Sequence, residues 1–96
     1  MILYHGTNSD FEKIDIAKTQ LHKDFGQGFY LTDIRQQAER MAMRKTRMLG
    51  GKPVVQEYEL DETKLSELTK QLEYKQLNKQ YYFGSERATS LLKRIK

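Results

Sequence analysis

Short runs of β-branched and aromatic residues, separated by polar and turn-forming residues, predict four strands along the chain. The first run lies beside the N-terminus and gives way to the turn-type residues Thr7-Asn8-Ser9-Asp10. Residues 10–27 have no regular period, with apolar side chains scattered at Phe11, Ile14, Ile16 and Leu21. The predicted strands cover residues 2–4, 29–32, 54–60 and 81–83.

Three other segments carry apolar residues at helical spacing. We expect the first helix to begin at an Asp33 N-cap and to stop at Gly50-Gly51, the second to follow Asp61 and the third to follow Ser85. The apolar positions are Ile34, Ala38, Met41, Ala42, Met48 and Leu49 in the first helix, Leu65, Leu68 and Leu72 in the second, and Ala88, Leu91, Leu92 and Ile95 in the third.

The order strand, loop, strand, helix, strand, helix, strand, helix is typical of a small α+β domain with a mixed sheet and packed helices. The 96 residues are enough for one domain, so residues 1–96 are interpreted as a single unit. Only 38% of the residues are apolar and 31% are charged, but their periodic grouping argues against disorder.

Composition narrows the chemistry. The chain has no cysteine, which excludes disulfides, thiolate metal sites and a cysteine nucleophile. With two histidines in all, we expect no structural metal. The chain opens directly on Met-Ile-Leu-Tyr-His without a signal peptide, and no apolar run approaches membrane-spanning length, so a cytoplasmic protein with no membrane contact is expected. The net charge of +4 suits an anionic partner, and equally an ordinary solvated basic surface.

Three short segments contain candidate site residues. In His5-Gly6-Thr7, the glycine would let a ligand approach the backbone, and the histidine could donate to a ribose hydroxyl. In Gly26-Gln27-Gly28-Phe29-Tyr30, the two glycines precede an aromatic pair whose side chains face opposite sides of a strand, so that one can stack on a pyridinium ring. The third segment opens at Gln80, and Glu86 falls in the first turn of the following helix, where a carboxylate is stabilised by the helix dipole. Taken singly, each segment also fits an ordinary turn, core strand or helix start.

Together these segments resemble the bacterial ADP-ribosyltransferase-like proteins grouped as domain of unknown function 3990. They are more distantly similar to the poly(ADP-ribose) polymerase and diphtheria toxin branch, which carries a His, Tyr and Glu triad. The likeness covers residues 1–60 and 76–96. Its motifs are His-Gly-Ser/Thr, matched at residues 5–7; Gly-x-Gly followed by an aromatic or aliphatic residue and Tyr, matched at 26–30; and a Glu, Asp or Gln opening a late strand, matched by Gln80.

The resemblance implies a compact ADP-ribosyltransferase-like fold and a transferase that uses NAD⁺ as its substrate, without a metal. It would release nicotinamide and pass ADP-ribose to a protein or nucleic-acid acceptor, as a mono-ADP-ribosyltransferase and a toxin-like effector. The implied catalytic residues are His5, Tyr30, Gln80 and Glu86, where Tyr30 stacks on the nicotinamide, His5 fixes a ribose hydroxyl and Gln80 accepts a hydrogen bond from the ribose. The implied NAD⁺-binding residues are His5, Gly6, Thr7, Lys23, Gly26, Gly28, Tyr30 and Met41, with Lys23 beside the pyrophosphate and Met41 as a second wall of the nicotinamide slot.

Two departures from the family pattern leave other readings open. Gln80 stands where the triad has Glu, which is compatible with a module that binds NAD⁺ or ADP-ribose without turnover. The stretch 61–77 is short, so a sheet strand would be missing or supplied by a partner, and we expect a homodimer or a cognate antitoxin-like protein. A third reading is a small basic nucleic-acid-binding protein, with phosphate contacts and base stacking from Arg40, Arg44, Lys45, Arg47, Tyr81 and Tyr82.

Overall fold

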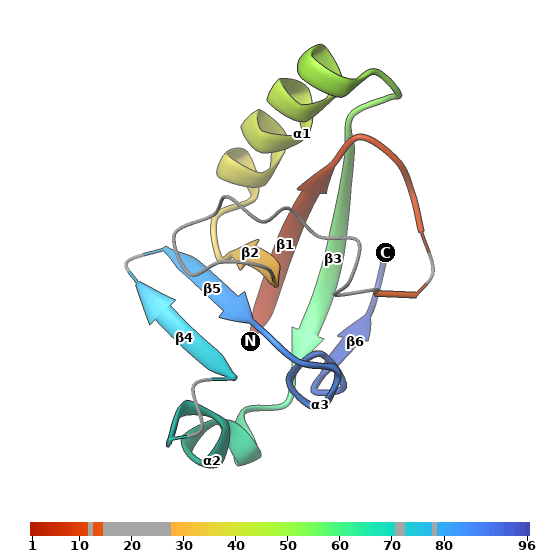
Figure 1. The fold of residues 1–96 in the computed structure, drawn as a ribbon. Helices are drawn as coiled ribbons and strands as arrows, with labels where there is room; N and C mark the ends of the chain where they lie inside the picture. The colour runs from red at the N-terminus through yellow and green to blue at the C-terminus, as the bar shows by residue number, and fades with distance from the viewer. Residues whose placement is uncertain (12, 15–27, 71–72, 78) are drawn as a thin grey trace.

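A computed structural model describes residues 1–11, 13–14, 28–70, 73–77 and 79–96 (Figure 1). None of the helices in these ranges is long and apolar enough to cross a membrane. The elements, in chain order, are β1 (Ile2–Thr7), β2 (Phe29–Thr32), α1 (Arg35–Leu49), β3 (Val54–Leu60), the 3-10 helix η2 (Glu62–Lys64), α2 (Leu65–Lys70), β4 (Tyr74–Leu77), β5 (Gln80–Phe83), α3 (Glu86–Thr89) and β6 (Leu92–Arg94).

The strands form one six-stranded sheet in the order β4-β5-β2-β1-β3-β6, and the small α+β fold is confirmed (Figure 1). Each described pairing is antiparallel, where the sequence analysis expected a mixed sheet. The reason is the path of the chain: β2 and β3 run in the same direction, but they lie on either side of β1. The α1 crossover therefore joins two strands that are not neighbours, and no parallel pair results.

The two faces of the sheet bury different partners, because side chains alternate along a strand. On one face, a core of aromatic and aliphatic side chains packs with Leu68 of α2 and Ala88 of α3. The strand residues of this core are Leu3, Phe29, Leu31, Tyr58, Leu60, Tyr74, Tyr81 and Phe83. On the other face lies α1, with the Arg35 guanidinium 5.8 Å from the centre of the Tyr4 ring.

The ends of α1 are only partly as predicted. Ile34, not Asp33, occupies the N-cap position and makes no side-chain capping bond. Thr32, and not Asp33, supplies the side chain that bonds to the start of the helix. Its hydroxyl accepts a hydrogen bond from the Ile34 N–H at 3.1 Å and donates to Gln37 Oε1 at 3.2 Å. The glycine stop is confirmed, since Gly50 has a φ of 84° and its N–H bonds to the Thr46 carbonyl.

The third predicted helix is wrong beyond its first turn. Ser85 caps α3 as expected, accepting a hydrogen bond from the Ala88 N–H at 3.0 Å, but α3 ends at Thr89. The following residues form β6, in which Leu92 lies opposite Leu60 and Arg94 opposite Tyr58. The spacing of Leu91, Leu92 and Ile95 also allows an extended strand, and pairing with β3 satisfies backbone groups that a helix would leave on an open edge.

The expected gap in the sheet is filled by the chain itself. Asp61 caps η2, as its side chain accepts from the Thr63 N–H, and β4 follows α2 and forms a hairpin with β5. β4 was not predicted, because its Tyr-Lys-Gln-Leu stretch is short and no glycine or proline marks where it begins. Leu72 lies outside the described residues. A homodimer or a dedicated partner stays a prediction, with β4 and β6 as the sheet edges available for it.

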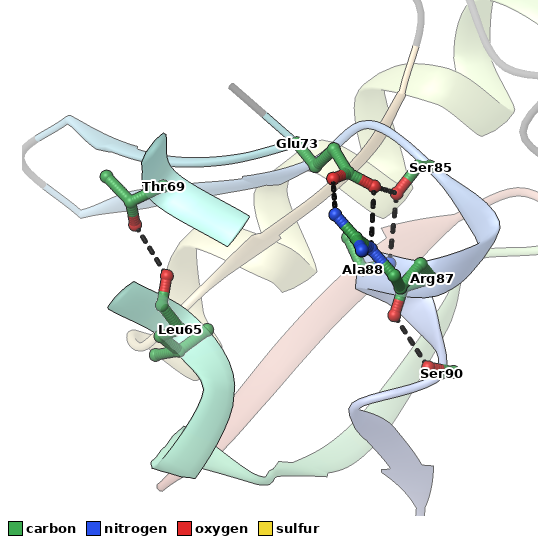
Figure 2. A network of polar contacts seen from close by, with 7 residues as sticks. All are labelled: Leu65, Thr69, Glu73, Ser85, Arg87, Ala88 and Ser90. Atoms are coloured by element: carbon green, nitrogen blue, oxygen red, sulfur yellow. Dashed lines mark hydrogen bonds and ion pairs between the residues drawn. The ribbon is translucent and has the colours of Figure 1, made fainter. Parts of the chain in front are cut away.

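A carboxylate just before β4 ties the hairpin to α3 (Figure 2). Glu73 accepts hydrogen bonds from the Ser85 hydroxyl, at 2.6 Å, and from the Arg87 guanidinium, which also forms an ion pair with it. The Glu73 carbonyl accepts from the Gly84 N–H at 2.7 Å. Hydrogen bonds from Arg87, and then from Ser85, hold the pKa of the Glu73 carboxyl below its usual value of 4.5. Two segments twelve residues apart are thereby joined through one side chain.

We expect Glu73→Gln to lower the free energy of unfolding at neutral pH and to lower it less in acid. A carboxyl whose pKa is depressed in the folded state stabilises the fold above its unfolded pKa, and that contribution is lost as the pH falls through the folded pKa. Urea denaturation at about pH 7 and about pH 3 measures both differences. Glu59→Gln, an exposed change on β3, is the matched control. A difference that stays constant with pH would contradict the role of the Glu73 charge.

Candidate functional site

The first two predicted motifs face one cavity of about 920 Å³, at the end of the sheet where β1 ends and β2 begins. The walls come from β1 with the residues that follow it, from the start of β2, from α1 and from the first residue of α3. Besides the motif residues His5, Gly6, Thr7, Gly28, Phe29 and Tyr30, the lining includes Asn8, Ser9, Phe11, Lys13, Ile14, Met41, Arg44, Lys45, Met48, Leu49 and Glu86. A space of this size is within the range of small-molecule sites.

His5 is fixed by its neighbours, and its tautomer follows from them. It lies within β1, which runs on to Thr7, and not at a turn as predicted. Its Nδ1 is 2.8 Å from the Tyr30 carbonyl oxygen, and its ring stacks on Phe29 with centroids 4.1 Å apart. A carbonyl oxygen can only accept, so Nδ1 carries the hydrogen. In a neutral imidazole Nε2 is then an acceptor, so a ligand hydroxyl would donate a hydrogen bond to His5. The prediction from sequence had the opposite direction, with His5 as the donor.

Gly6 has a structural role in the packing of α1, apart from any role in binding a ligand. A Cβ on Gly6 would lie 2.0 Å from the Ala38 carbonyl oxygen and 2.9 Å from the Ala42 nitrogen, both in the backbone of α1. The missing side chain is thus what allows α1 to pack directly on β1. Thr7, also predicted to bind the ligand, is buried beside it and lines the cavity.

The second motif is shaped by Tyr82 of β5. A Cβ on Gly28 would lie 2.2 Å from the Tyr82 ring, so this glycine makes room for an aromatic neighbour. Tyr30 lines the cavity but is only 5% exposed, and its ring packs on Tyr82 with centroids 5.2 Å apart. Truncating so buried a ring to alanine typically costs about 3–5 kcal/mol, so a Tyr30→Ala variant tests folding as much as binding. Tyr30→Phe keeps the buried ring, so it is the better variant for testing ligand binding. Gly26 and Lys23 lie outside the described residues.

The cavity has a cationic and apolar wall on α1. Met41, which the resemblance implies as a second wall of the nicotinamide slot, is among its lining residues together with Arg44 and Lys45. Lys13 adds a cation from the segment after β1. Lys23, which was predicted to lie beside the pyrophosphate, is outside the described residues. The three cations in the described lining suit an anionic ligand such as a pyrophosphate.

The structure separates the two candidates for the third catalytic position. Gln80 is half-buried at the start of β5, opposite Thr32, two residues along the strand from the Tyr30–Tyr82 pair. It does not belong to the described lining of the cavity, whereas Glu86 does. Glu86 is also exposed in the first turn of α3, the helix-start position that its sequence context predicted. Of the two residues, Glu86 and not Gln80 is among those that line the cavity together with the first two motifs.

A buried polar network that sequence reasoning missed holds Phe11 at the cavity. The Gln56 amide, fully buried, donates to Asp10 Oδ1 and to the Phe11 carbonyl, both at 3.0 Å, and accepts from the Tyr58 hydroxyl at 2.7 Å. Arg94 donates to the same carbonyl and, at 2.6 Å, to Asp10. The hydrogen bond from Gln56, and then that from Arg94, lowers the pKa of Asp10. A polar residue at the centre of the predicted third strand was the only signal for this network.

The network has a direct effect on the cavity wall. The Phe11 ring makes a T-shaped contact with His5, with ring centroids 5.8 Å apart, and another with Phe29, with centroids 6.1 Å apart. Arg94, near the end of the described chain, therefore helps to position aromatic rings that pack on the predicted catalytic histidine. Burial also raises the pKa of Tyr58 to about 12, so its hydroxyl remains a donor to Gln56 at neutral pH.

We expect Arg94→Ala to lower the free energy of unfolding by about 2 kcal/mol, because hydrogen bonds made by a charged group contribute roughly 1.5–3 kcal/mol. Urea denaturation measures the change, and the exposed neighbour Lys93→Ala on the same strand is its control. Equal stability of the two variants would show that Arg94 does not hold the segment at Asp10 and Phe11.

A family model described as protein of unknown function (DUF3990) matches residues 1–70. This match includes both motifs that face the cavity and stops before Gln80 and Glu86. No curated protein and no solved structure matches the chain. Within the described part of the chain, no group of three or more histidine or carboxylate side chains could hold a metal ion.

Proposed function

The chain belongs to the DUF3990 family of proteins of unknown function, and from this premise we propose that it binds NAD⁺, splits the bond to nicotinamide and transfers ADP-ribose to a macromolecular acceptor. One observation supports the proposal most. Residues 5–7 and 28–30, which belong to two motifs far apart in the chain, line the same cavity, and its described lining also holds three cations and one carboxylate. This is a set of groups suited to a dinucleotide with a cationic ring at one end and a pyrophosphate at its centre.

The chemistry assigned to each group follows from its atoms. In the proposed reaction the bond between the ribose C1′ and the nicotinamide nitrogen breaks, and nicotinamide leaves as a neutral base with the bonding electrons. A bond forms between C1′ and the acceptor, whose proton is released. Positive charge develops on the ribose in the transition state, where a carboxylate such as Glu86 would stabilise it. In the neutral form of the imidazole, the Nε2 atom of His5 would accept a hydrogen bond from a ribose hydroxyl. Arg44, Lys45 and Lys13 would neutralise the pyrophosphate.

The test is to incubate the protein with NAD⁺ labelled on its adenylate half, alone and with a bacterial lysate. Nicotinamide is measured by chromatography, the label is followed into macromolecules, and NAD⁺ affinity is measured by calorimetry. We expect nicotinamide release and a labelled acceptor. Binding without release would show the alternative, a module that holds NAD⁺ or ADP-ribose without turnover. Absence of both binding and release would overturn the proposal.

A further inference from the structure

One exposed stripe of α1 belongs only partly to the site described above, because two of its five residues also line the cavity. It consists of Arg40, Met43, Arg44, Arg47 and Met48, and we call it the arginine–methionine stripe. The spacing of three and four residues places all five on one side of the helix, away from Ala38 and Ala42, which are buried against the sheet. Met43 is 56% exposed and Met48 is 72% exposed. These exposed methionines lie on either side of Arg44 and Arg47 in the sequence, so the stripe offers apolar as well as cationic contacts to a partner.

The arginines of the stripe lie in a segment of α1 and its following turn that carries only positive charge. Residues 40–52 contain five arginines and lysines and no aspartate or glutamate. The ion pairs found on α1 in the described structure are those of Arg35, with Glu39 and Glu57 at the start of the helix. None of the ion pairs between described residues involves an arginine of the stripe. The stripe thus presents three positive charges together with two polarisable apolar side chains.

We propose that the arginine–methionine stripe docks an acidic segment of a partner protein that also carries apolar side chains. Charge complementarity calls for an anionic partner, which is either a nucleic acid or an acidic protein segment. The methionines decide between these two kinds of partner. A nucleic-acid backbone would use the arginines and leave Met43 and Met48 in water. An amphipathic helix with carboxylates and leucines would use both, because its carboxylates can pair with the arginines and methionine side chains adapt to apolar partners.

The position of the stripe gives the docking a consequence. Arg44 and Met48 also line the cavity, so a segment bound along the stripe would lie at the mouth of the candidate site. The turns of α1 that carry the stripe stand at the opposite end of the molecule from α2 and α3 (Figure 1). Such a partner would deliver an acceptor to the cavity or block it. The docking itself does not depend on NAD⁺ chemistry.

The experiment uses a fluorescein-labelled helical peptide of about 18 residues, made of glutamate, leucine and alanine, and measures its binding to the full chain by anisotropy. We expect saturable binding that Arg44→Glu/Arg47→Glu weakens at least about ten-fold, or roughly 1.4 kcal/mol. Met43→Gln/Met48→Gln should weaken it by a similar factor. The matched controls are Lys79→Glu/Lys93→Glu for charge and Ile95→Gln for an exposed apolar side chain, and they should bind as the parent does. Thermal melts show that each variant is folded.

Three results would overturn the inference. The first is no binding of the acidic peptide by the folded parent protein. The second is equal weakening by the stripe variants and their controls, which would mean attraction by net charge alone. The third is tight binding of a DNA or RNA oligonucleotide that displaces the peptide and depends on the arginines but not on the methionines, which would assign the stripe to nucleic acid. Failure of nicotinamide release leaves all three readouts unaffected, because no NAD⁺ is added.

Discussion

Gly6→Ala should lose about 4 kcal/mol or more of its free energy of unfolding and, in a domain this small, most of its folded population. The added methyl group would lie 2.0 Å from the Ala38 carbonyl oxygen, inside the closest approach of carbon and oxygen. The obstacle is the backbone of a 15-residue helix, which cannot rotate away as a side chain can. To relieve the clash, α1 must move off β1 and expose the buried faces of Ala38 and Ala42. Urea denaturation and the far-ultraviolet circular dichroism of the variant measure the loss.

Gly50→Ala separates this clash from the general cost of replacing a glycine. Gly50 has no heavy atom within 4 Å of its ideal Cβ position, but its φ of 84° is in the left-handed region. The expected cost is therefore about 1–3 kcal/mol of backbone strain with no steric clash, because this φ is combined with a ψ of −170°, a conformation that is essentially limited to glycine. If Gly6→Ala costs no more than Gly50→Ala, α1 and β1 are not in direct backbone contact.

The fold was predictable where several local signals agreed. Residues 29–32 and 54–60 are strands as expected, because each combines β-branched or aromatic residues with a clear boundary in glycine or proline. The end of α1 was predictable for the same reason, since Gly50 marks a clear boundary. Prediction failed at β4 and β6, which are four and three residues long and have no glycine or proline to mark where they begin. Both are edge strands, whose conformation is fixed by pairing with β5 and β3 and not by their own sequence.

The proximity of the first two motifs was predictable, but their internal contacts were not. The proximity of residues 5–7 to residues 28–30 followed from motif order, and the structure places both at one cavity. Side-chain direction did not follow. The glycines at 6 and 28 serve packing against Ala38 and Tyr82, and the amide of Gln56 organises the segment at Phe11. These contacts join residues far apart in the chain, which a local pattern does not encode.

The third position of the site decides what chemistry the cavity supports, and it gives the second prediction. We expect Glu86→Gln to slow nicotinamide release by about a hundred-fold, or roughly 2.7 kcal/mol of barrier, since it removes the one carboxylate in the described lining of the cavity. Gln80→Ala should change the rate by no more than about three-fold, since the Gln80 side chain is not in that lining. Glu67→Gln, an exposed carboxylate in the first turn of α2, is the matched control for Glu86.

Both rate changes are measured as single-turnover release of nicotinamide from saturating NAD⁺, with NAD⁺ affinity determined separately for each variant. A loss confined to the rate, with affinity retained, is what a group acting on the charge of the transition state produces. The opposite ranking, with Gln80→Ala inactive and Glu86→Gln active, would return the third position to the start of β5, as motif order alone predicts. In that case Gln80→Glu should raise the rate by about ten-fold, because it adds a negative charge where positive charge develops. Glu86 would then be a helix-start residue that happens to border the cavity.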